Sequence, residues 1–273
     1  MSIIEAIRKR RSVRSYSGDQ LSDDIKEKII QYINGLEAPF GAKVRIKLIS
    51  KQGSGNGEKL GTYGVIKGAA NFLVLAYEES DMAEYAVGYV FEQVVLYCTE
   101  LGLGTCWIGG TFKHKDFAEQ IWIKPNEKLR IISPLGYGLG KSRLLESIMR
   151  GMVKSDKRKP FETIFFSMNF SSPLREIDAG KFLKPLQMLR LSPSASNTQP
   201  WRVVKEYDCF HFYYNASASR FSAIDMGIAL CHFEQTCIEI GLPGCLTVKS
   251  EMISERIEKG CCYAMSWVSK PVN

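Results

Sequence analysis

The sequence has few residues that could bind a metal and no long apolar run. Its three histidines, His114, His211 and His232, do not lie with cysteine or carboxylate residues at the spacing of a metal site. No run approaches about 18 apolar residues, and the N-terminal stretch mixes charged with apolar residues. We therefore expect a cytoplasmic protein with no bound metal and no membrane partner.

Cysteine is not scarce, but no two cysteines have the CxxC spacing. The eight cysteines lie at irregular intervals, and Cys98, Cys231 and Cys237 fall on apolar helical patterns. Such positions favour reduced thiols in a core over disulfides. The adjacent Cys261 and Cys262 could form a redox-active pair, although their place near an expected C-terminal strand favours a structural role.

The positive charge is moderate and dispersed. The chain has 36 Lys and Arg against 29 Asp and Glu, a net charge of +7, and acidic residues are interleaved throughout. The densest basic cluster, residues 154–159, is short and suits a single phosphate as well as a nucleic acid. We expect no nucleic-acid partner.

Apolar spacing predicts helices and strands of a globular α+β protein. Helices are expected over residues 3–7, 21–36 and 85–104. Strands are expected over residues 44–50, 71–79, 105–112 and 128–138. The glycine-containing stretches 53–57 and 136–142 resemble nucleotide-binding loops only in part, because each lacks a required glycine position, so neither predicts a nucleotide site.

A repeat divides the chain into two halves. Two stretches that start at Gly88 and at Gly227 match at a constant offset of 139 residues. Identical residues recur at the same positions of the expected helix, and both helices end at a glycine. The matched residues are Gly88, Cys98, Glu100, Gly102, Leu103 and Cys106 with Gly227, Cys237, Glu239, Gly241, Leu242 and Cys245. The sequence therefore predicts two copies of one unit, residues 1–150 and 151–273, joined by a basic linker near residues 150–159.

The two halves differ in the groups that could bind a ligand. Arg10, Ser12 and Arg14 are spaced by two, so on an extended chain they form either an anion-binding site or a solvated basic face. The second half has only Arg175 at the comparable place, but it contains the polar loop 192–201. That loop either binds a polar planar ligand or is a turn that satisfies its own backbone. One complete set of groups drawn from two halves predicts a pseudo-dimer with a site at the seam.

RRSVRSY at residues 10–16 together with PSASNTQPW at residues 193–201 resembles the FMN-dependent nitroreductase family, in particular its fused tandem branch. The resemblance extends over nearly the whole chain. It implies a nitroreductase-like α+β fold of two tandem copies, each an antiparallel or mixed sheet flanked by helices, packed as a pseudo-dimer within one chain. It also implies FMN as cofactor and NADH or NADPH as electron donor.

The resemblance implies a role for individual residues. Arg10, Arg11 and Ser12 match the phosphate-side groups, and Arg14 matches a cation at the pyrimidine end of the flavin. Gly109 and Gly110 match the place where a backbone amide approaches flavin N5, and Lys157 and Lys159 match a late phosphate-binding segment. The loop that closes over the flavin is matched by Pro193, Ser194, Ala195, Ser196 and Asn197. The stretch 61–64 departs from the family pattern, which leaves one pyrimidine contact unassigned.

The resemblance implies a ping-pong oxidoreductase in which NAD(P)H reduces the flavin and leaves before a nitroaromatic, quinone or similar acceptor binds. No catalytic side chain is expected, because the chemistry takes place at flavin N5. A related enzyme could use the same flavin for dehalogenation or flavin fragmentation. A non-catalytic FMN-binding or redox-sensing protein is a further alternative. We expect a monomer that acts as a pseudo-dimer, with further association possible.

Overall fold

The computed structural model describes residues 1–50, 61–139, 157–249 and 260–270. The expected loop at 53–57 and much of the expected linker at 150–159 lie outside these residues. The chain forms two compact units. The first comprises residue 1 and residues 9–149, and the second comprises residues 2–8 and 150–273. Helix α1 (Ile3–Lys9) therefore belongs largely to the second unit, where Glu239 accepts a hydrogen bond from the backbone N–H of Ile3.

The first unit is built on a four-stranded antiparallel sheet in the order β1-β2-β4-β3. Its strands are β1 (Val44–Ser50), β2 (Asn71–Glu78), β3 (Gly104–Thr105) and β4 (Glu127–Gly136). The central strand β2 is buried along all but its last residue. Burial on both faces explains why its sequence is a continuous apolar run and not an alternating one.

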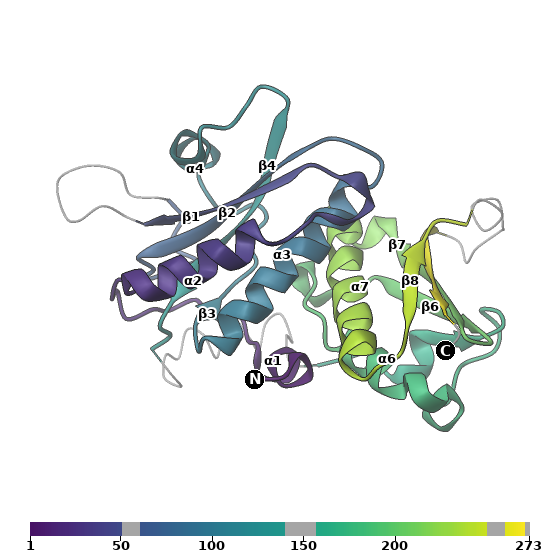
Figure 1. The fold of residues 1–273 in the computed structure, drawn as a ribbon. Helices are drawn as coiled ribbons and strands as arrows, with labels where there is room; N and C mark the ends of the chain where they lie inside the picture. The colour runs from purple at the N-terminus through teal and green to yellow at the C-terminus, as the bar shows by residue number, and fades with distance from the viewer. Residues whose placement is uncertain (51–60, 140–156, 250–259, 271–273) are drawn as a thin grey trace. The chain divides into compact units, whose positions relative to one another are not determined.

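Helices cover both faces of this sheet (Figure 1). They are α2 (Asp23–Asn34), α3 (Ala83–Glu100) and α4 (His114–Ile121). Phe72 and Val74 of β2 pack in one cluster with Phe117 of α4, whereas α2 and α3 lie on the opposite face. Ser22 caps the start of α2, because its hydroxyl accepts from the backbone N–H of Ile25.

The strand expected over residues 105–112 is much shorter than predicted. Regular pairing stops after Thr105, because the backbone N–H of Cys106 donates to the Ser133 hydroxyl at 3.0 Å instead of to a strand carbonyl. Ile108 then forms an isolated bridge with Ile132, and Gly109 begins a bend. The short helix α4, which was not predicted, follows directly.

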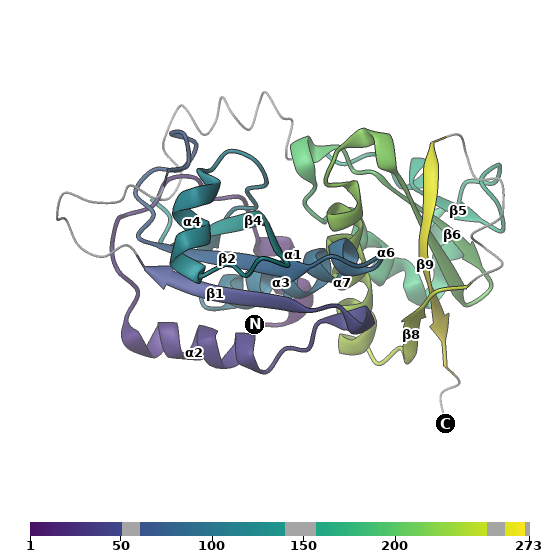
Figure 2. The same cartoon turned by 90° about the horizontal axis from the view of Figure 1, so that it is seen from above.

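The second unit is built on a five-stranded sheet in the order β5-β6-β7-β9-β8. The strands are β5 (Phe165–Ser167), β6 (Trp201–Glu206), β7 (Cys209–Asn215), β8 (Gly244–Thr247) and β9 (Cys261–Ser269). Only β5 pairs in parallel, with β6, and the other neighbours are antiparallel. Helix α6 (Leu183–Arg190) packs against α7 (Ser222–Glu239), and α7 contacts the sheet through β7 and β8 (Figure 2). Short 3-10 turns complete the described chain at η1 (Pro39–Gly41), η2 (Phe161–Thr163), η3 (Glu176–Phe182), η4 (Ala195–Asn197) and η5 (Ala216–Ala218).

The repeat is visible in the topology of the two units. The order β1-β2-β4-β3 corresponds to β6-β7-β9-β8, and in each unit a 3-10 turn precedes the first of these strands, η1 before β1 and η4 before β6. Helices α3 and α7 begin and end at positions with the same offset of 139 residues as the sequence match, and Gly102 and Gly241 follow them with φ of 78° and 72°. No helix within the described ranges is long and apolar enough to cross a membrane.

Candidate functional site

Arg10 is a buried cation of the first unit. Its side chain is 7% exposed, and its Nε lies 3.8 Å from Oε1 of Glu92, a fully buried residue of α3. Among the described residues, neither Nε nor Nη1 of Arg10 has a hydrogen-bond partner. Burial lowers the pKa of Arg10, and the Glu92 carboxylate opposes that shift. Unpartnered guanidinium N–H groups in an interior favour an anion, and a phosphate would fit them.

The residues after Arg10 form an extended segment that is tied to two other parts of the first unit. Val13 N donates to Thr105 O at 2.8 Å, Lys67 N donates to Arg14 O at 2.9 Å, and Tyr16 N donates to Lys67 O at 2.9 Å. These bonds fix the backbone that carries Ser12 and Arg14, both half-buried. The neighbouring Arg11 is exposed, and its Nη1 donates back to Arg10 O at 2.8 Å.

One glycine is required for this arrangement. Gly68 adopts φ of 73°, and a Cβ at this position would lie 2.2 Å from the carbonyl oxygen of Tyr16. No other residue fits that close approach of two backbones. Gly68 therefore keeps the segment of Arg14 against Lys67.

Gly109 and Gly110, which are expected near flavin N5, follow Trp107, a second residue in contact with Glu92. Nε1 of Trp107 donates to Glu92 Oε2 at 2.7 Å, so this carboxylate connects the Arg10 side chain to the residues before Gly109. Ile108 exchanges two backbone hydrogen bonds of 3.0 Å with Ile132. Gly109 is half-buried and Gly110 is exposed in the bend that follows. The structure thus brings Arg10 and the glycine segment near one buried acid that sequence reasoning missed.

The loop Pro193–Gln199 of the second unit connects α6 to β6 and is strained. Ser196, Asn197 and Gln199 have φ of 50°, 55° and 49°, which is unusual for residues other than glycine. The Ser194 hydroxyl accepts from the backbone N–H of Gln199 at 2.9 Å. Part of the loop's polar capacity therefore serves its own backbone, as expected for a turn.

Lys157 and Lys159 are packed onto this same loop. Nδ2 of Asn197 donates to Lys157 O at 2.9 Å, the backbone N–H of Lys159 donates to Gln199 Oε1 at 2.8 Å, and Lys159 Nζ donates to Gln199 O at 3.1 Å. The structure thus brings together two stretches that the sequence had assigned separately. The intervening Arg158, which was not selected from the sequence, donates from Nη1 to Asn197 Oδ1 at 3.3 Å. Burial and the nearby Arg202 lower the pKa of Lys159.

Several buried polar atoms around the loop have no protein partner. Within the described residues, Ser192 Oγ, Thr198 Oγ1 and Trp201 Nε1 are buried and make no hydrogen bond. Buried polar atoms are normally satisfied by protein, ordered water or a ligand. Their concentration at the loop is compatible with a polar ligand there.

The loop is also held from the helix behind it by Asp225, a second residue that sequence reasoning missed. Asp225 is 4% exposed in the first turn of α7, and both its carboxylate oxygens lie 3.1 Å from the backbone N of Ala195. Burial raises the pKa of Asp225 to about 7, and the Ala195 N–H opposes the shift. The sequence signal that could have identified Asp225 is an acidic residue among the apolar residues at the start of α7.

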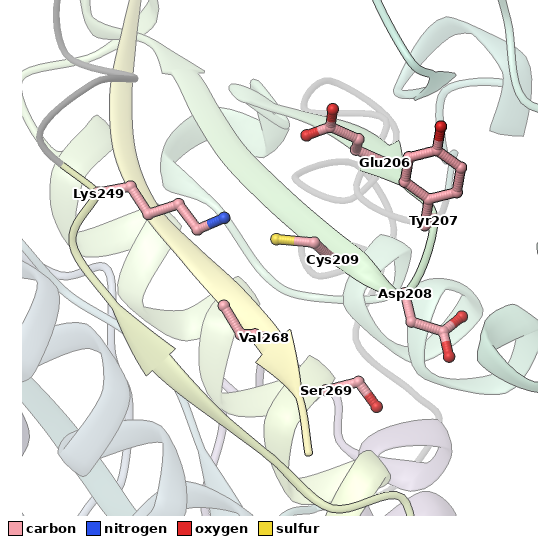
Figure 3. Close-up of a pocket in the computed structure, with 7 residues that line it drawn as sticks. All are labelled: Glu206, Tyr207, Asp208, Cys209, Lys249, Val268 and Ser269. Carbon is pink, nitrogen blue, oxygen red and sulfur yellow. The ribbon is translucent and has the colours of Figure 1, made fainter. Parts of the chain in front are cut away.

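A separate pocket lies in the second unit and contains none of the candidate residues (Figure 3). It is lined by Glu206, Tyr207, Asp208, Cys209, Lys249, Val268 and Ser269. Figure 3 shows the Lys249 ammonium directed toward the Cys209 sulfur. Burial nevertheless raises the pKa of Cys209 above its usual value, more than Lys249 lowers it, which argues against a reactive thiolate. All eight cysteines are free, and the described residues contain no group of three or more potential metal ligands.

Comparisons with known proteins give a consistent family. The model of the family described as "Putative TM nitroreductase" matches residues 2–237. The crystal structure of a "putative nitroreductase" from Thermotoga maritima is similar over 98% of this chain and 92% of that chain, with 22% identity and a TM-score of 0.59. This likeness supports the fold.

Two further structures are each similar over about half of the length of this chain. An FMN-dependent nitroreductase from Clostridium difficile covers 51% of this chain and 90% of its own, with 18% identity and a TM-score of 0.41. A nitroreductase with bound FMN from Bacteroides fragilis covers 53% and 92%, with 19% identity and a TM-score of 0.42. A search of curated proteins finds no match. Because the family model spans most of its length, the chain belongs to the TM nitroreductase family.

Proposed function

We propose that this chain is an FMN-dependent oxidoreductase that takes electrons from NADH or NADPH and passes them to a nitroaromatic, quinone or similar small acceptor. The observation that carries the proposal is the buried Arg10 guanidinium, whose Nε and Nη1 make no hydrogen bond within the described residues although Glu92 Oε1 lies 3.8 Å from Nε. In a chain of the TM nitroreductase family, the anion that best fits these donors is the FMN phosphate.

Each candidate residue has a physical role in this proposal. Arg10 and Ser12 would donate to the phosphate, with the charged donor making the stronger bond. Arg14 would place a positive charge at the pyrimidine edge, where negative charge develops on reduction. Gly109 and Gly110 carry no side chain, so their backbone could approach the ring closely. Within the second unit, the loop Pro193–Asn197 and the segment Lys157–Lys159 lie together and carry polar groups and cations that would also bind FMN.

FMN, when bound, supplies the two-electron redox chemistry. The protein residues bind it, orient it and balance its charge, which agrees with the absence of an assigned catalytic side chain. The donor and the acceptor would occupy the same open face in turn. That ping-pong order requires no separate dinucleotide-binding motif, in keeping with the incomplete glycine patterns of the sequence.

The test is to purify the protein, add FMN, remove the unbound flavin and record the visible spectrum. Anaerobic titration with NADH and with NADPH should then bleach the flavin band, and steady oxidation of the donor should begin when a quinone or nitroaromatic is added. A protein that retains no FMN would overturn the proposal. Retention of FMN without donor oxidation would reduce it to a flavin-binding or redox-sensing role.

A further inference from the structure

Asp225 occupies a position that costs the fold stability. A carboxylate that is 4% exposed loses most of its hydration, and its only hydrogen-bond donor within the described residues is the backbone N–H of Ala195. One neutral donor does not compensate for removing a charge from water. An apolar side chain at this position of α7 could be buried without that loss of hydration. The role of the carboxylate is therefore to be found in the segment that it hydrogen-bonds.

What it holds is the start of a strained loop. Ala195 directly precedes Ser196 and Asn197, whose left-handed φ angles of 50° and 55° are uncommon for residues other than glycine. Such a backbone keeps its conformation only when its surroundings restrain it. The Asp225 carboxylate accepts from the backbone N–H of Ala195. Within the loop itself, Ser194 Oγ accepts from the backbone N–H of Gln199.

The first half of the chain provides an internal comparison. With the offset of 139 residues that relates α3 to α7, Asp225 corresponds to Ala86, which is fully buried and has no polar side chain. The corresponding turn η1 includes Gly41, and Phe40 is its single non-glycine residue with positive φ. A turn between these elements can thus form without a carboxylate behind it. The fold therefore does not require the acid, which occurs only in the half that contains the polar loop.

We propose that Asp225 is a positioning residue that anchors Ala195 and so presents the loop Pro193–Asn197 in the conformation that receives the flavin. This inference rests on the proposed function for its ligand, but the anchor itself is a property of the flavin-free chain. The isosteric Asp225→Asn variant keeps an oxygen that can accept from Ala195. The Asp225→Ala variant removes the acceptor.

The experiment measures two quantities on the full chain. Hydrogen exchange of the Ala195 amide, without flavin, reports the anchor, and titration of FMN fluorescence reports the dissociation constant. For Asp225→Ala we expect loss of amide protection and a dissociation constant raised about tenfold or more, whereas Asp225→Asn should stay within about threefold of the parent. Asp208→Ala is the matched control, because Asp208 is an exposed acid of the same unit paired with Lys181.

Thermal unfolding at pH 8 separates positioning from general damage. Because the buried charge is unfavourable, Asp225→Ala should not unfold at a lower temperature than the parent, even though it binds FMN more weakly. If that variant does not fold, Asp225→Leu, which fills the space without an acceptor, replaces it. An unchanged dissociation constant in the folded variant overturns the positioning role. Failure of the parent to bind FMN overturns the proposed function and the flavin part of this inference, and the exchange data still decide the anchor.

Discussion

The indole N–H of Trp107 donates to the buried carboxylate of Glu92 at 2.7 Å, and the other oxygen of that carboxylate lies 3.8 Å from Nε of Arg10. One acid on α3 therefore contacts both the candidate phosphate-binding arginine and the segment that leads to Gly109. Its charge also keeps Arg10 from being an uncompensated buried cation.

Replacing Glu92 by Gln should destabilise the protein. The variant keeps an acceptor for Trp107 but leaves Arg10 buried without a counter-charge, so we expect the free energy of unfolding to fall by about 3 kcal/mol in urea denaturation. Glu119→Gln is the matched control, because its pair with Lys115 also measures 3.8 Å but is exposed. That control should change stability by less than about 0.5 kcal/mol. Equal effects of the two substitutions would contradict the role of burial.

Arg10→Ala should weaken FMN binding. Loss of a charge-assisted contact to the phosphate is expected to cost roughly 1.5 to 3 kcal/mol, which is about 10- to 150-fold in the dissociation constant measured by fluorescence titration. The adjacent Lys9 is exposed and is not assigned to the site, so it provides the control, and Lys9→Ala should bind FMN nearly as the parent does. The assignment of Arg10 fails if both variants bind with the parent's affinity.

Gly68→Ala should be strongly destabilising. The new Cβ would lie 2.2 Å from Tyr16 O in a backbone with φ of 73°, so two backbones must move apart. We expect a loss of about 3 kcal/mol or more in the free energy of unfolding, of which only about 1 kcal/mol is conformational. Gly64→Ala isolates the conformational part, because Gly64 has φ of 78° and nothing within 4 Å of the added atom. A similar loss at both positions would show that the contact with Tyr16 relaxes freely.

Asp225 should make the protein less stable as the pH rises. Its folded-state pKa of about 7 lies above the ordinary carboxyl value of 3.8, so the folded state binds the proton more tightly than the unfolded state does. Stability from this group is full below the ordinary value and is lost between about pH 4 and pH 7, by roughly 4 kcal/mol in total. Asp225→Asn removes this dependence, so its stability relative to the parent should increase from pH 4 to pH 8 in urea denaturation. A constant difference across that range would show that the acid titrates normally.

One FMN should bind per chain. Only the first half carries the set Arg10, Ser12 and Arg14, and the comparable Arg175 of the second half is exposed and already paired with Asp178 at 2.6 Å. Several missing charge-assisted bonds of about 1.5 to 3 kcal/mol each would weaken a second site by orders of magnitude. Flavin released by denaturation, quantified against protein by amino-acid analysis, gives the ratio. A value near two at saturation would contradict the divergence of the halves.

The sequence by itself determined the elements whose signal is local. Helix α2, the long helix α3 and the buried strand β2 follow from the spacing of apolar residues, and the duplication follows from a constant offset between matching residues. Helix α4 was missed, because its eight residues carry too few apolar positions to show a period. Resemblance of two separated motifs then gave the family.

Tertiary structure alone decided which groups meet. Glu92 beside Arg10, Asp225 beside Ala195 and Arg158 beside Asn197 join residues distant in sequence, and no periodicity encodes such pairs. The early end of β3 depends in the same way on the Ser133 hydroxyl, which takes the N–H of Cys106 from the ladder. Local spacing sets which face of a helix or strand is apolar, whereas the partner of a buried polar group depends on how the chain brings those faces together.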